Sequence, residues 1–562
     1  MHLNRVRNQN GVVTVLVRET YREEGKVKKR TLANLTHLPA DVQELVGRAL
    51  AGETMGAASD LEILETRHHG HVEAVMLAMR KLGLARLISP TRTRERDLVM
   101  ALIAARILEP SSKLAVTRWW ETTTLPDVLG LGTEVCEDEL YQAMDWLVDQ
   151  QAAIETRLGK KHLENCGLVL YDLSSSYVEG TKCELAARGY SRDGKKDKLQ
   201  VNYGLLTDEN GCPVSVTVYP GNTGDPATVR DQIDKLREQF GLDLVVFVGD
   251  RGMVAQTTVE KLREQEGVEW ITALKSGAIN KLNADGALQM SLFDKRDIFE
   301  LASPRYPDER LIACRNPLLA ERRARKRKEM LDATRRELAK VRGMVRRGTL
   351  RGRATIGIRV GRVINKYKMA KHFKVEITDA GFSYCVRRDT VRKEASVDGV
   401  YIIRTSVPAE VIDTDDVVRH YKRLTRVEKC FRTMKMSGLE VRPIYHRKER
   451  RVRAHIFLCM LALYVQWHMQ RAWRPLLFAE ETDTLPDRHP VQPAKPTAQA
   501  KAKRATKRTD DGLPAQSFRS LLANLATIAK NVCRLGKRTP TFEKFTKRTP
   551  LQTRAFSLLN AL

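Results

Sequence analysis

The chain has 562 residues, which is enough for about two to four domains of ordinary size. Its 97 lysine and arginine residues against 69 acidic residues give a formal net charge of +28, and such an excess favours a polyanionic partner, nucleic acid above all. A hydrophobic content of 42% indicates a mostly globular protein, and the longest apolar run, residues 456–465, is too short for a membrane span of about 20 residues.

The cysteines and the amino terminus indicate the compartment. Nine cysteines are scattered along the chain without a CxxC pair, which excludes a zinc ribbon and gives no disulfide framework. The first residues lack the apolar core of a signal peptide. We therefore expect a soluble protein of the reducing cytosol.

The first 160 residues divide into a short strand region and a helical region. Residues 12–17 and 28–35 alternate as two strands around a charged turn. Apolar residues at three- and four-residue spacing then predict helices over 71–84, 94–108 and 139–158. This helical domain could recognise DNA ends, although helical bundles serve many purposes. Its basic side chains, which we expect at the surface, are Arg92, Arg94, Arg96, Lys113 and Arg118.

A strand-rich block follows. Strands are predicted over 167–174, 200–207 and 213–220, with the last two joined by a turn at 208–211. A helix over 225–240 leads into the continuous apolar strand 242–250, and a helix over 257–266 precedes a strand over 268–274. This order predicts a mixed sheet flanked by helices.

Residues 276–396 interrupt that pattern. A long basic helix is predicted over 317–347, and its run RRARKRK favours contact with a DNA backbone over a solvated, self-associating arm. Strands are predicted over 355–363, 374–378 and 382–387, after which strand 399–405 resumes the sheet.

The helix predicted over 421–435 organises the rest of the chain. Helical spacing puts the apolar Leu424 and Phe431 on one stripe with Glu428 and basic residues. A carboxylate among cations suits a metal-dependent site on a phosphate backbone, and i,i+4 charge pairs on an amphipathic helix are the alternative. Beyond it we expect a core helix over 452–470, a flexible tether over 480–515, a helix over 516–535 and a basic tail.

Three acids form the candidate catalytic site, two at or near the ends of buried strands and one on a helix face: Asp172, Asp250 and Glu428. Converging carboxylates repel one another unless cations lie between them, and oxygen ligands without a Cys/His cluster point to Mg²⁺ or Mn²⁺. Two such ions can activate an attacking water or 3′-hydroxyl and stabilise the leaving oxygen, so the reaction would be phosphoryl transfer on nucleic acid. Arg251 would stabilise charge on the phosphate or form a surface ion pair.

The order of the motifs YDLSSSYVEG, VNYGLL, VTVYPGNTGD, VVFVGDRGM, WITALK, DGVYIIRT and YKRLTRVEKCFRTMK resembles the bacterial insertion-sequence DDE transposases of the IS-four superfamily, over roughly residues 160–475. The resemblance implies an RNase H-like α/β fold, a β-rich insertion before the third acid and cut-and-paste movement of DNA. By position, Asp172 and Asp250 match the family's aspartates and Glu428 its glutamate. A bacterial, cytoplasmic, nucleoid-associated location follows from the same resemblance.

The family's Tyr-Arg-Glu-Lys signature is matched by Tyr421, Glu428 and Lys435, but Leu424 stands at the arginine position and is expected to pack inward. No tryptophan lies in the insertion, so a mechanism through a DNA hairpin does not carry over. The residues that we expect on DNA are Tyr421, Arg423, Arg426, Arg432, Lys435 and Arg251.

The sequence thus predicts a DNA transposase that uses Mg²⁺ or Mn²⁺, as two ions, to cut at the terminal inverted repeats of its element and to join the 3′-hydroxyl to target DNA. It would act as a homodimer in the DNA synapse. The alternatives are a metal-dependent nuclease without strand transfer and a non-catalytic DNA-binding regulator. The expected divisions are a β-containing region (1–60), a helical DNA-end-binding domain (61–160), the catalytic core (161–275 and 397–475), an insertion (276–396), a linker (476–515) and a basic C-terminal segment (516–562).

Overall fold

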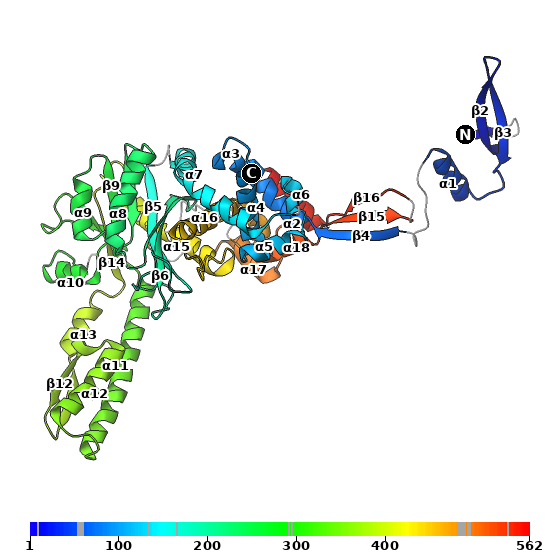
Figure 1. The fold of residues 1–562 in the computed structure, drawn as a ribbon. Helices are drawn as coiled ribbons and strands as arrows, with labels where there is room; N and C mark the ends of the chain where they lie inside the picture. Colours follow the sequence, from blue (N-terminus) through cyan, green and yellow to red (C-terminus); the bar gives the residue numbers. More distant parts are fainter. Residues whose placement is uncertain are drawn as a thin grey trace.

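The computed structural model describes residues 1–562 apart from 8–10, 53–60, 133, 164–166, 290, 292, 294–295, 480–489, 492–495 and 537–538. Its centre is a mixed sheet of eight strands in the order β10-β11-β14-β9-β8-β5-β6-β7 (Figure 1). Their bounds are β5 Leu168–Tyr177, β6 Gln200–Asp208, β7 Pro213–Pro220, β8 Val245–Gly249, β9 Val268–Ala273, β10 Ile298–Leu301, β11 Arg310–Arg315 and β14 Val400–Thr405.

Five of these strands give the sheet its RNase H-like order. β5, β6 and β7 form an antiparallel meander, and β8 and β9 continue the sheet parallel to β5. In the parallel pair, Tyr171 of β5 lies opposite Gly249 of β8. Asp172 and Asp250 each come one residue later, so the register brings both acids to the same region of the sheet, as the sequence predicts.

The strands are long apolar runs because both faces of the sheet are covered. Every residue of β6 is buried, and this is typical of a strand at the centre of an α/β protein. Gly204 of β6 lies under the ring of Tyr171, where an added β-carbon would stand 2.0 Å from the Tyr171 hydroxyl oxygen. A side chain at Gly204 would therefore clash with the buried ring of Tyr171, the residue before Asp172.

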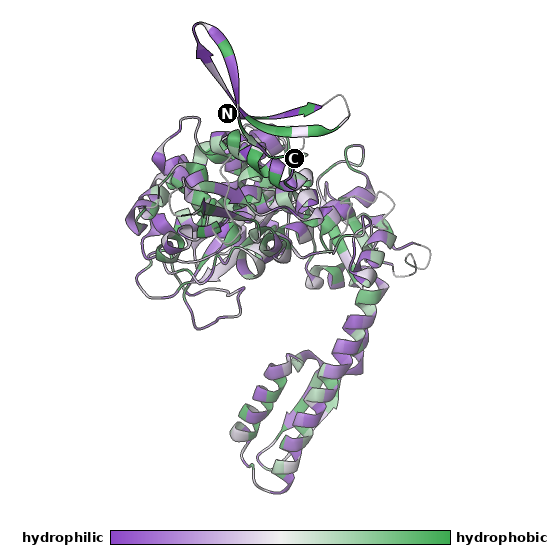
Figure 2. Ribbon diagram, turned by 90° about the vertical axis from the view of Figure 1, so that its right-hand side faces the viewer, coloured by the Kyte–Doolittle hydropathy of each residue, from purple (hydrophilic) through white to green (hydrophobic). Residues whose placement is uncertain are grey.

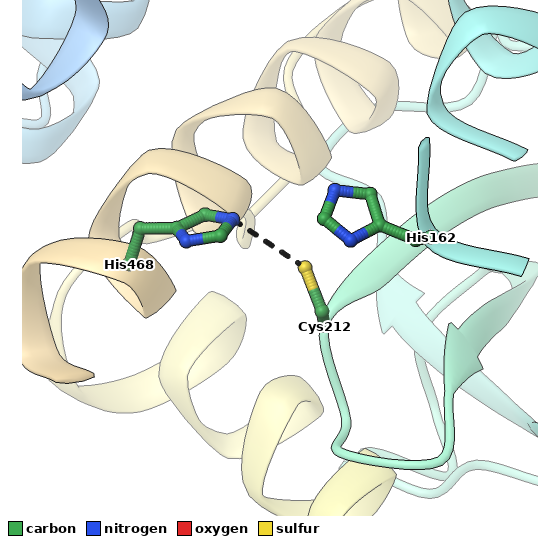
Figure 3. A group of neighbouring side chains, drawn as sticks. All are labelled: His162, Cys212 and His468. Atoms are coloured by element: carbon green, nitrogen blue, oxygen red, sulfur yellow. Dashed lines mark hydrogen bonds between the residues drawn. The ribbon is translucent and has the colours of Figure 1, made fainter. Parts of the chain in front are cut away.

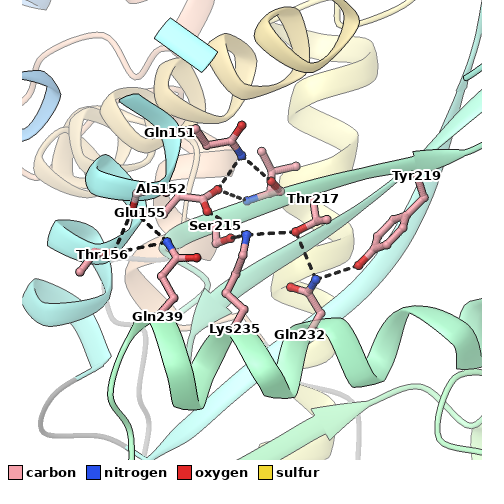
Figure 4. A network of polar contacts seen from close by, with 11 residues as sticks. Gln151, Ala152, Glu155, Thr156, Ser215, Thr217, Tyr219, Gln232, Lys235 and Gln239 are labelled. Carbon is pink, nitrogen blue, oxygen red and sulfur yellow. Dashed lines mark hydrogen bonds and ion pairs between the residues drawn. The ribbon is translucent and has the colours of Figure 1, made fainter. Parts of the chain in front are cut away.

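The edge strand β7 is covered by side chains of α7 (Glu137–Leu163) instead of by another strand. Glu155 accepts a hydrogen bond from the Val216 amide (3.0 Å), and Gln151 donates to the Val216 carbonyl (2.9 Å; Figure 4). Lys235 pairs with Glu155 at 2.8 Å and donates to Ser215 at 2.9 Å. This buried network fastens the helical region to the sheet and occupies an edge that would otherwise be open to pairing.

Helices surround the sheet. The predicted helix 225–240 begins as α8 (Asp225–Asp234) and ends as a π-helical turn, Lys235–Gln239. The other helices beside the sheet are α9 Gln256–Arg263, α10 Ser276–Ala284, α14 Thr414–Lys422, α15 Leu424–Arg432 and α16 Glu449–Ala472, with a π turn over Thr433–Ser437. The helix expected over 421–435 is thus broken at Arg423, which ends α14 and precedes α15.

An arm, residues 317–395, projects from the sheet (Figures 1 and 2). It contains α11 Pro317–Arg346, α12 Arg353–Tyr367, a 3₁₀ turn Ala370–His372, the hairpin of β12 Phe373–Ile377 and β13 Phe382–Val386, and α13 Arg388–Ala395. The strand predicted over 355–363 is wrong. Ile356, Val360 and Ile364 recur every four residues and pack as one helical face against the apolar side of α11. β10 and β11 precede the arm and extend the central sheet.

The first strands form a separate sheet at the amino terminus. It consists of β1 His2–Arg7, β2 Val13–Glu23 and β3 Lys26–Asn34, followed by α1 Ala40–Leu50. The predicted pair around the charged turn is confirmed, and β1 and α1 are additional. Figure 1 shows these elements apart from the rest of the molecule.

The helical region and the C-terminal segment form one body. Its helices are α2 Gly70–Leu82, α3 Leu84–Ile88, α4 Arg94–Leu108, α5 Lys113–Trp120 and α6 Leu125–Leu129. β15 (Ala529–Leu535) pairs with both β4 (Leu61–His68) and β16 (Phe542–Phe545), and α18 (Phe518–Ala526) and α19 (Pro550–Asn560) pack on α2. The helix expected over 516–535 is therefore a helix followed by a strand.

Two further expectations change in this part of the chain. The tether predicted over 480–515 lies partly outside the described residues, and its described part holds helix α17 (Ala498–Thr506), with Lys503 buried. A 3₁₀ turn, Arg474–Leu476, ends the core helix region. Of the basic residues expected at the surface, Arg96 and Lys113 are buried. No helix in the described part of the chain is long and apolar enough to cross a membrane.

Candidate active site

Asp172 lies on β5 with its carboxylate largely withdrawn from solvent. Burial raises the pKa of this carboxyl group to about 7, although the hydrogen bond that Oδ1 accepts from the Leu173 amide (2.8 Å) opposes the rise. The negative charges of Asp250 and Glu428 raise the pKa further, while Arg192 lowers it. The three predicted acids are therefore close enough to influence one another electrostatically.

Asp250 follows β8 directly and is exposed. The hydroxyl of Tyr421 donates a hydrogen bond of 3.4 Å to Asp250 Oδ1. A β-carbon built on Gly252 would stand 3.6 Å from Asp250 Oδ2 and 3.9 Å from Asp225 Oδ2, so the two carboxylates flank this glycine. Asp225 begins α8 and lies near Asp250, and the sequence reasoning did not select it.

Glu428 is exposed on α15, and the predicted apolar anchors hold this helix. Leu424 and Phe431 are buried, and α15 packs across β5 and β6. The expectation that Leu424 packs inward is confirmed. The helix that carries Glu428 thus lies against the strand that carries Asp172.

The three carboxylates do not all lie within 4.8 Å of one another. Among the described residues, the one group of three metal-ligand side chains that meets this distance is His162, Cys212 and His468. Uncompensated like charges keep such a distance. A pair of ions about 3.5–4 Å apart, each with bonds of about 2.0–2.1 Å, is held by acids that can stand roughly 6–8 Å from one another. The donor set consists of carboxylate oxygens, which fits hard divalent cations.

A buried charge cluster lies behind the acids. Asp193 pairs with Lys435 at 2.9 Å and with Arg442 at 2.5 Å, and its side chain is 2% exposed. Arg192, the preceding residue, pairs with Asp225. The signature lysine is thus held in the protein by an aspartate, and the loop after β5 is fixed against the site.

The remaining predicted DNA-binding residues divide into two groups. Arg423 pairs with Glu209, and Arg426 donates to the Glu209 carbonyl at 2.9 Å, so both arginines fasten α15 to the turn between β6 and β7. Arg432 is exposed on α15. Arg251 is exposed too, and it lines a cavity of about 360 Å³ with residues of the arm, among them Arg323, Lys326, Arg327 and Lys371.

Comparison with known families decides the class. The family model described as "Transposase DDE domain" matches residues 167–465, which span the sheet, the arm and all three acids. The chain belongs to the DDE transposase family. A second model, the N-terminal domain of IS1634 family transposases, matches residues 3–59. This DDE transposase is a DNA-cleaving and strand-transferring enzyme of an insertion sequence, as the sequence predicts.

The chain was also compared with solved structures and with curated proteins. A solved structure similar to the transposase is a piggyBac transposase synaptic complex with hairpin DNA, at 10% sequence identity and a TM-score of 0.32, covering 81% of this chain and 76% of that one. No curated protein matches the chain. Enzymes with a DDE domain generally depend on divalent metal ions, in keeping with the donor set described above.

Proposed function

We propose that Asp172, Asp250 and Glu428 are the catalytic acids of this transposase and that they hold two Mg²⁺ ions. The observations that carry the proposal are geometric: the register of β5 and β8 brings Asp172 and Asp250 to the same region of the sheet, and α15, which carries Glu428, packs across β5. Acids on three separate elements rarely interact by accident at the end of one sheet, and perturbed carboxyl groups gather at functional sites. When bound, the ions activate a water or 3′-hydroxyl and stabilise the oxygen that leaves phosphorus.

The protein's own groups prepare this site. Tyr421 donates to Asp250 and limits the orientations of a carboxylate that is otherwise exposed. Asp172 is half protonated near pH 7 when its pKa is about 7, so it releases a proton when a cation binds. Arg192 holds Asp225 beside the acids and contributes positive charge near Asp172.

The DNA substrate is proposed to lie across the acids and the adjoining basic surface. Arg251 and Arg432 are exposed next to the acids, and the cavity that Arg251 shares with the arm is rich in lysine and arginine. These groups suit phosphates of the terminal inverted repeats and of the target. Lys435, Arg423 and Arg426 would act through the position of α15, and Tyr421 through Asp250. Two ends must meet in one complex, so the transposase is proposed to act as a homodimer.

The test is incubation of the full chain with Mg²⁺ and labelled DNA carrying one element end. Joined products support the transposase, cut products alone support a nuclease without strand transfer, and an unaltered bound duplex supports a regulator. Asp172→Asn should abolish cleavage while end binding stays nearly intact. Asp231→Asn, an exposed aspartate on α8, is the matched control and should cleave normally.

Replacing Mg²⁺ by Ca²⁺ should allow DNA binding without chemistry, because Ca²⁺ bonds are longer and less directional. Cleavage by Asp172→Asn at the rate of the unaltered protein would overturn the assignment of the acids. Cleavage by Asp172→Asn and loss of cleavage in Asp225→Asn would shift the assignment to the neighbouring acid.

A further inference from the structure

A second cluster of ligand-type side chains lies away from the three acids. His162 stands near the end of α7, Cys212 follows the turn after β6, and His468 lies on α16. One ligand atom from each lies within 4.8 Å of the other two, and Cys212 Sγ is 3.7 Å from His468 Nε2. Figure 3 shows both imidazole rings and the thiol turned toward one point.

The spacing suits a tetrahedral ion. Zinc bonds of about 2.3 Å to sulfur and about 2.0–2.1 Å to nitrogen separate neighbouring ligand atoms by roughly 3.5 Å. The distance between Cys212 and His468 is 3.7 Å, within a few tenths of an ångström of that value. Two imidazoles and one thiolate form a borderline-soft donor set, which favours Zn²⁺ and disfavours Mg²⁺.

The surroundings orient the ligands. Nε2 of His162 lies 3.1 Å from the Tyr464 hydroxyl, which leaves Nδ1 as the nitrogen that could bind an ion. The Tyr464 ring also meets the His468 ring edge-on, with centroids 4.7 Å apart.

We propose that His162, Cys212 and His468 form a Zn²⁺ site, with Tyr464 orienting His162. The site is structural: it joins the helical region, the β6–β7 turn and the core helix α16 at one point. The thiol gives up its proton when the ion binds, and the imidazoles bind in their neutral form.

The turn between β6 and β7, which carries Cys212, also supports α15. Glu209 and Asn210 bind Arg423 and Arg426, and Cys430 Sγ donates to the Gly211 carbonyl at 3.3 Å. An ion on Cys212 would therefore restrain the turn on which the helix of Glu428 lies. This last step rests on the proposed function, whereas the metal site itself does not.

The test measures zinc and cobalt in the full chain, in the presence of excess Mg²⁺. After removal of weakly bound metal, we expect about one Zn²⁺ per chain, and Co²⁺ in its place should give the ultraviolet thiolate-to-cobalt band of a Cys ligand. Cys212→Ser should remove the band and His468→Gln should remove the bound zinc. Cys459→Ser, a buried cysteine on the same core helix as His468, and Asp172→Asn should keep both.

Tyr464→Phe should weaken zinc binding about 10–100-fold without removing a ligand, and it keeps the proposal testable if the ligand variants fold poorly. Zinc content that is the same in Cys212→Ser and Cys459→Ser, or a Co²⁺ complex without the thiolate band, would overturn the site and leave a packed His–Tyr–Cys cluster. Loss of zinc binding by the Asp172→Asn variant alone would place the ion at the catalytic acids and overturn it as well. The cleavage assay of Asp172→Asn is independent of these zinc measurements, so failure of the zinc site and failure of the proposed function can be told apart.

Discussion

The central sheet and the arm use charged residues in opposite ways. Around the sheet, charges are buried and paired: the side chain of Glu155 is 1% exposed beside Lys235, and Asp193 is enclosed by Lys435 and Arg442. Along α11 most basic residues face solvent, namely Arg322, Arg325, Lys326, Lys328, Arg335, Arg336, Lys340 and Arg346.

The difference shows that the basic residues behind the net charge of +28 have two separate roles in this transposase. A paired, buried cation fixes the shape of the protein because removing its partner leaves an uncompensated charge. An exposed cation on the arm contributes little to folding and remains available to phosphates. The same residue types therefore serve stability in one region and substrate binding in the other.

The largest expected stability effect lies in the network of Figure 4. Glu155→Ala should lower the free energy of unfolding by about 3–5 kcal/mol, because Lys235 loses its partner and the Val216 amide loses its acceptor. Chemical denaturation of the full chain measures this. Asp234→Ala, which breaks an exposed pair with Arg230, is the control and should cost about 0–1 kcal/mol.

The arm has an apolar core of its own, and it should open separately from the sheet. Ile356→Ala should cost about 2–5 kcal/mol within the arm, because Ile356 is fully buried against α11. Hydrogen exchange should show loss of protection over α11 and α12 while β5 and β6 stay protected. Equal loss of protection in both regions would show that arm and sheet fold as one unit.

Exposed charge on the arm should affect DNA and not stability. Arg325→Gln with Lys328→Gln should lower the slope of log K against log salt by about 2, the value for two phosphate contacts. Binding to duplex DNA at several salt concentrations measures it. Lys501→Gln with Arg504→Gln removes equal exposed charge from α17 and serves as the control. Equal slopes for the two variants would contradict a role of the arm in DNA binding.

The smallest effect on the free energy of unfolding is expected for an exposed ion pair on the arm. Lys340→Ala removes an exposed pair with Glu337 (2.7 Å), three residues away on α11. The free energy of unfolding should change by less than about 0.5 kcal/mol, because solvent screens the pair. A loss above about 1 kcal/mol in thermal unfolding would mean that arm charges stabilise the fold as the core charges do.

Much of the sheet could be predicted because its strands are apolar runs bounded by turns. β7 has the predicted limits, and the order of β5 to β9 follows from the alternation of strands and helices. Strand 355–363 was predicted wrongly because Ile356, Ile358 and Val360 also alternate. Ile358 is exposed, and the helical repeat to Ile364 decides the conformation through packing on α11.

Site residues could be predicted where the local sequence pattern marks them. They were missed where they are defined only by contact between residues far apart in the sequence. Asp172 follows an apolar run within β5 and Asp250 directly follows the apolar strand β8, and both are local features. The pairing of Asp193 with Lys435 joins residues 242 positions apart, and no local pattern marks it. Similarly, the sequence shows no local Cys/His cluster, but the fold brings His162, Cys212 and His468 together from three separate elements. The burial of Lys113 likewise depends on tertiary packing.

The pairing of β4 with β15 has a consequence for synthesis on the ribosome. β4 gains its partner only after residue 535 has been made, and Gly70 sits so tightly beneath the Leu525 carbonyl that an added β-carbon would stand 2.3 Å from it. The helical region is therefore completed by residues translated much later than its own helices. A nascent chain that ends between residues 428 and 529 carries all three acids without this closure, so the helical region closes only after the catalytic sheet has been translated.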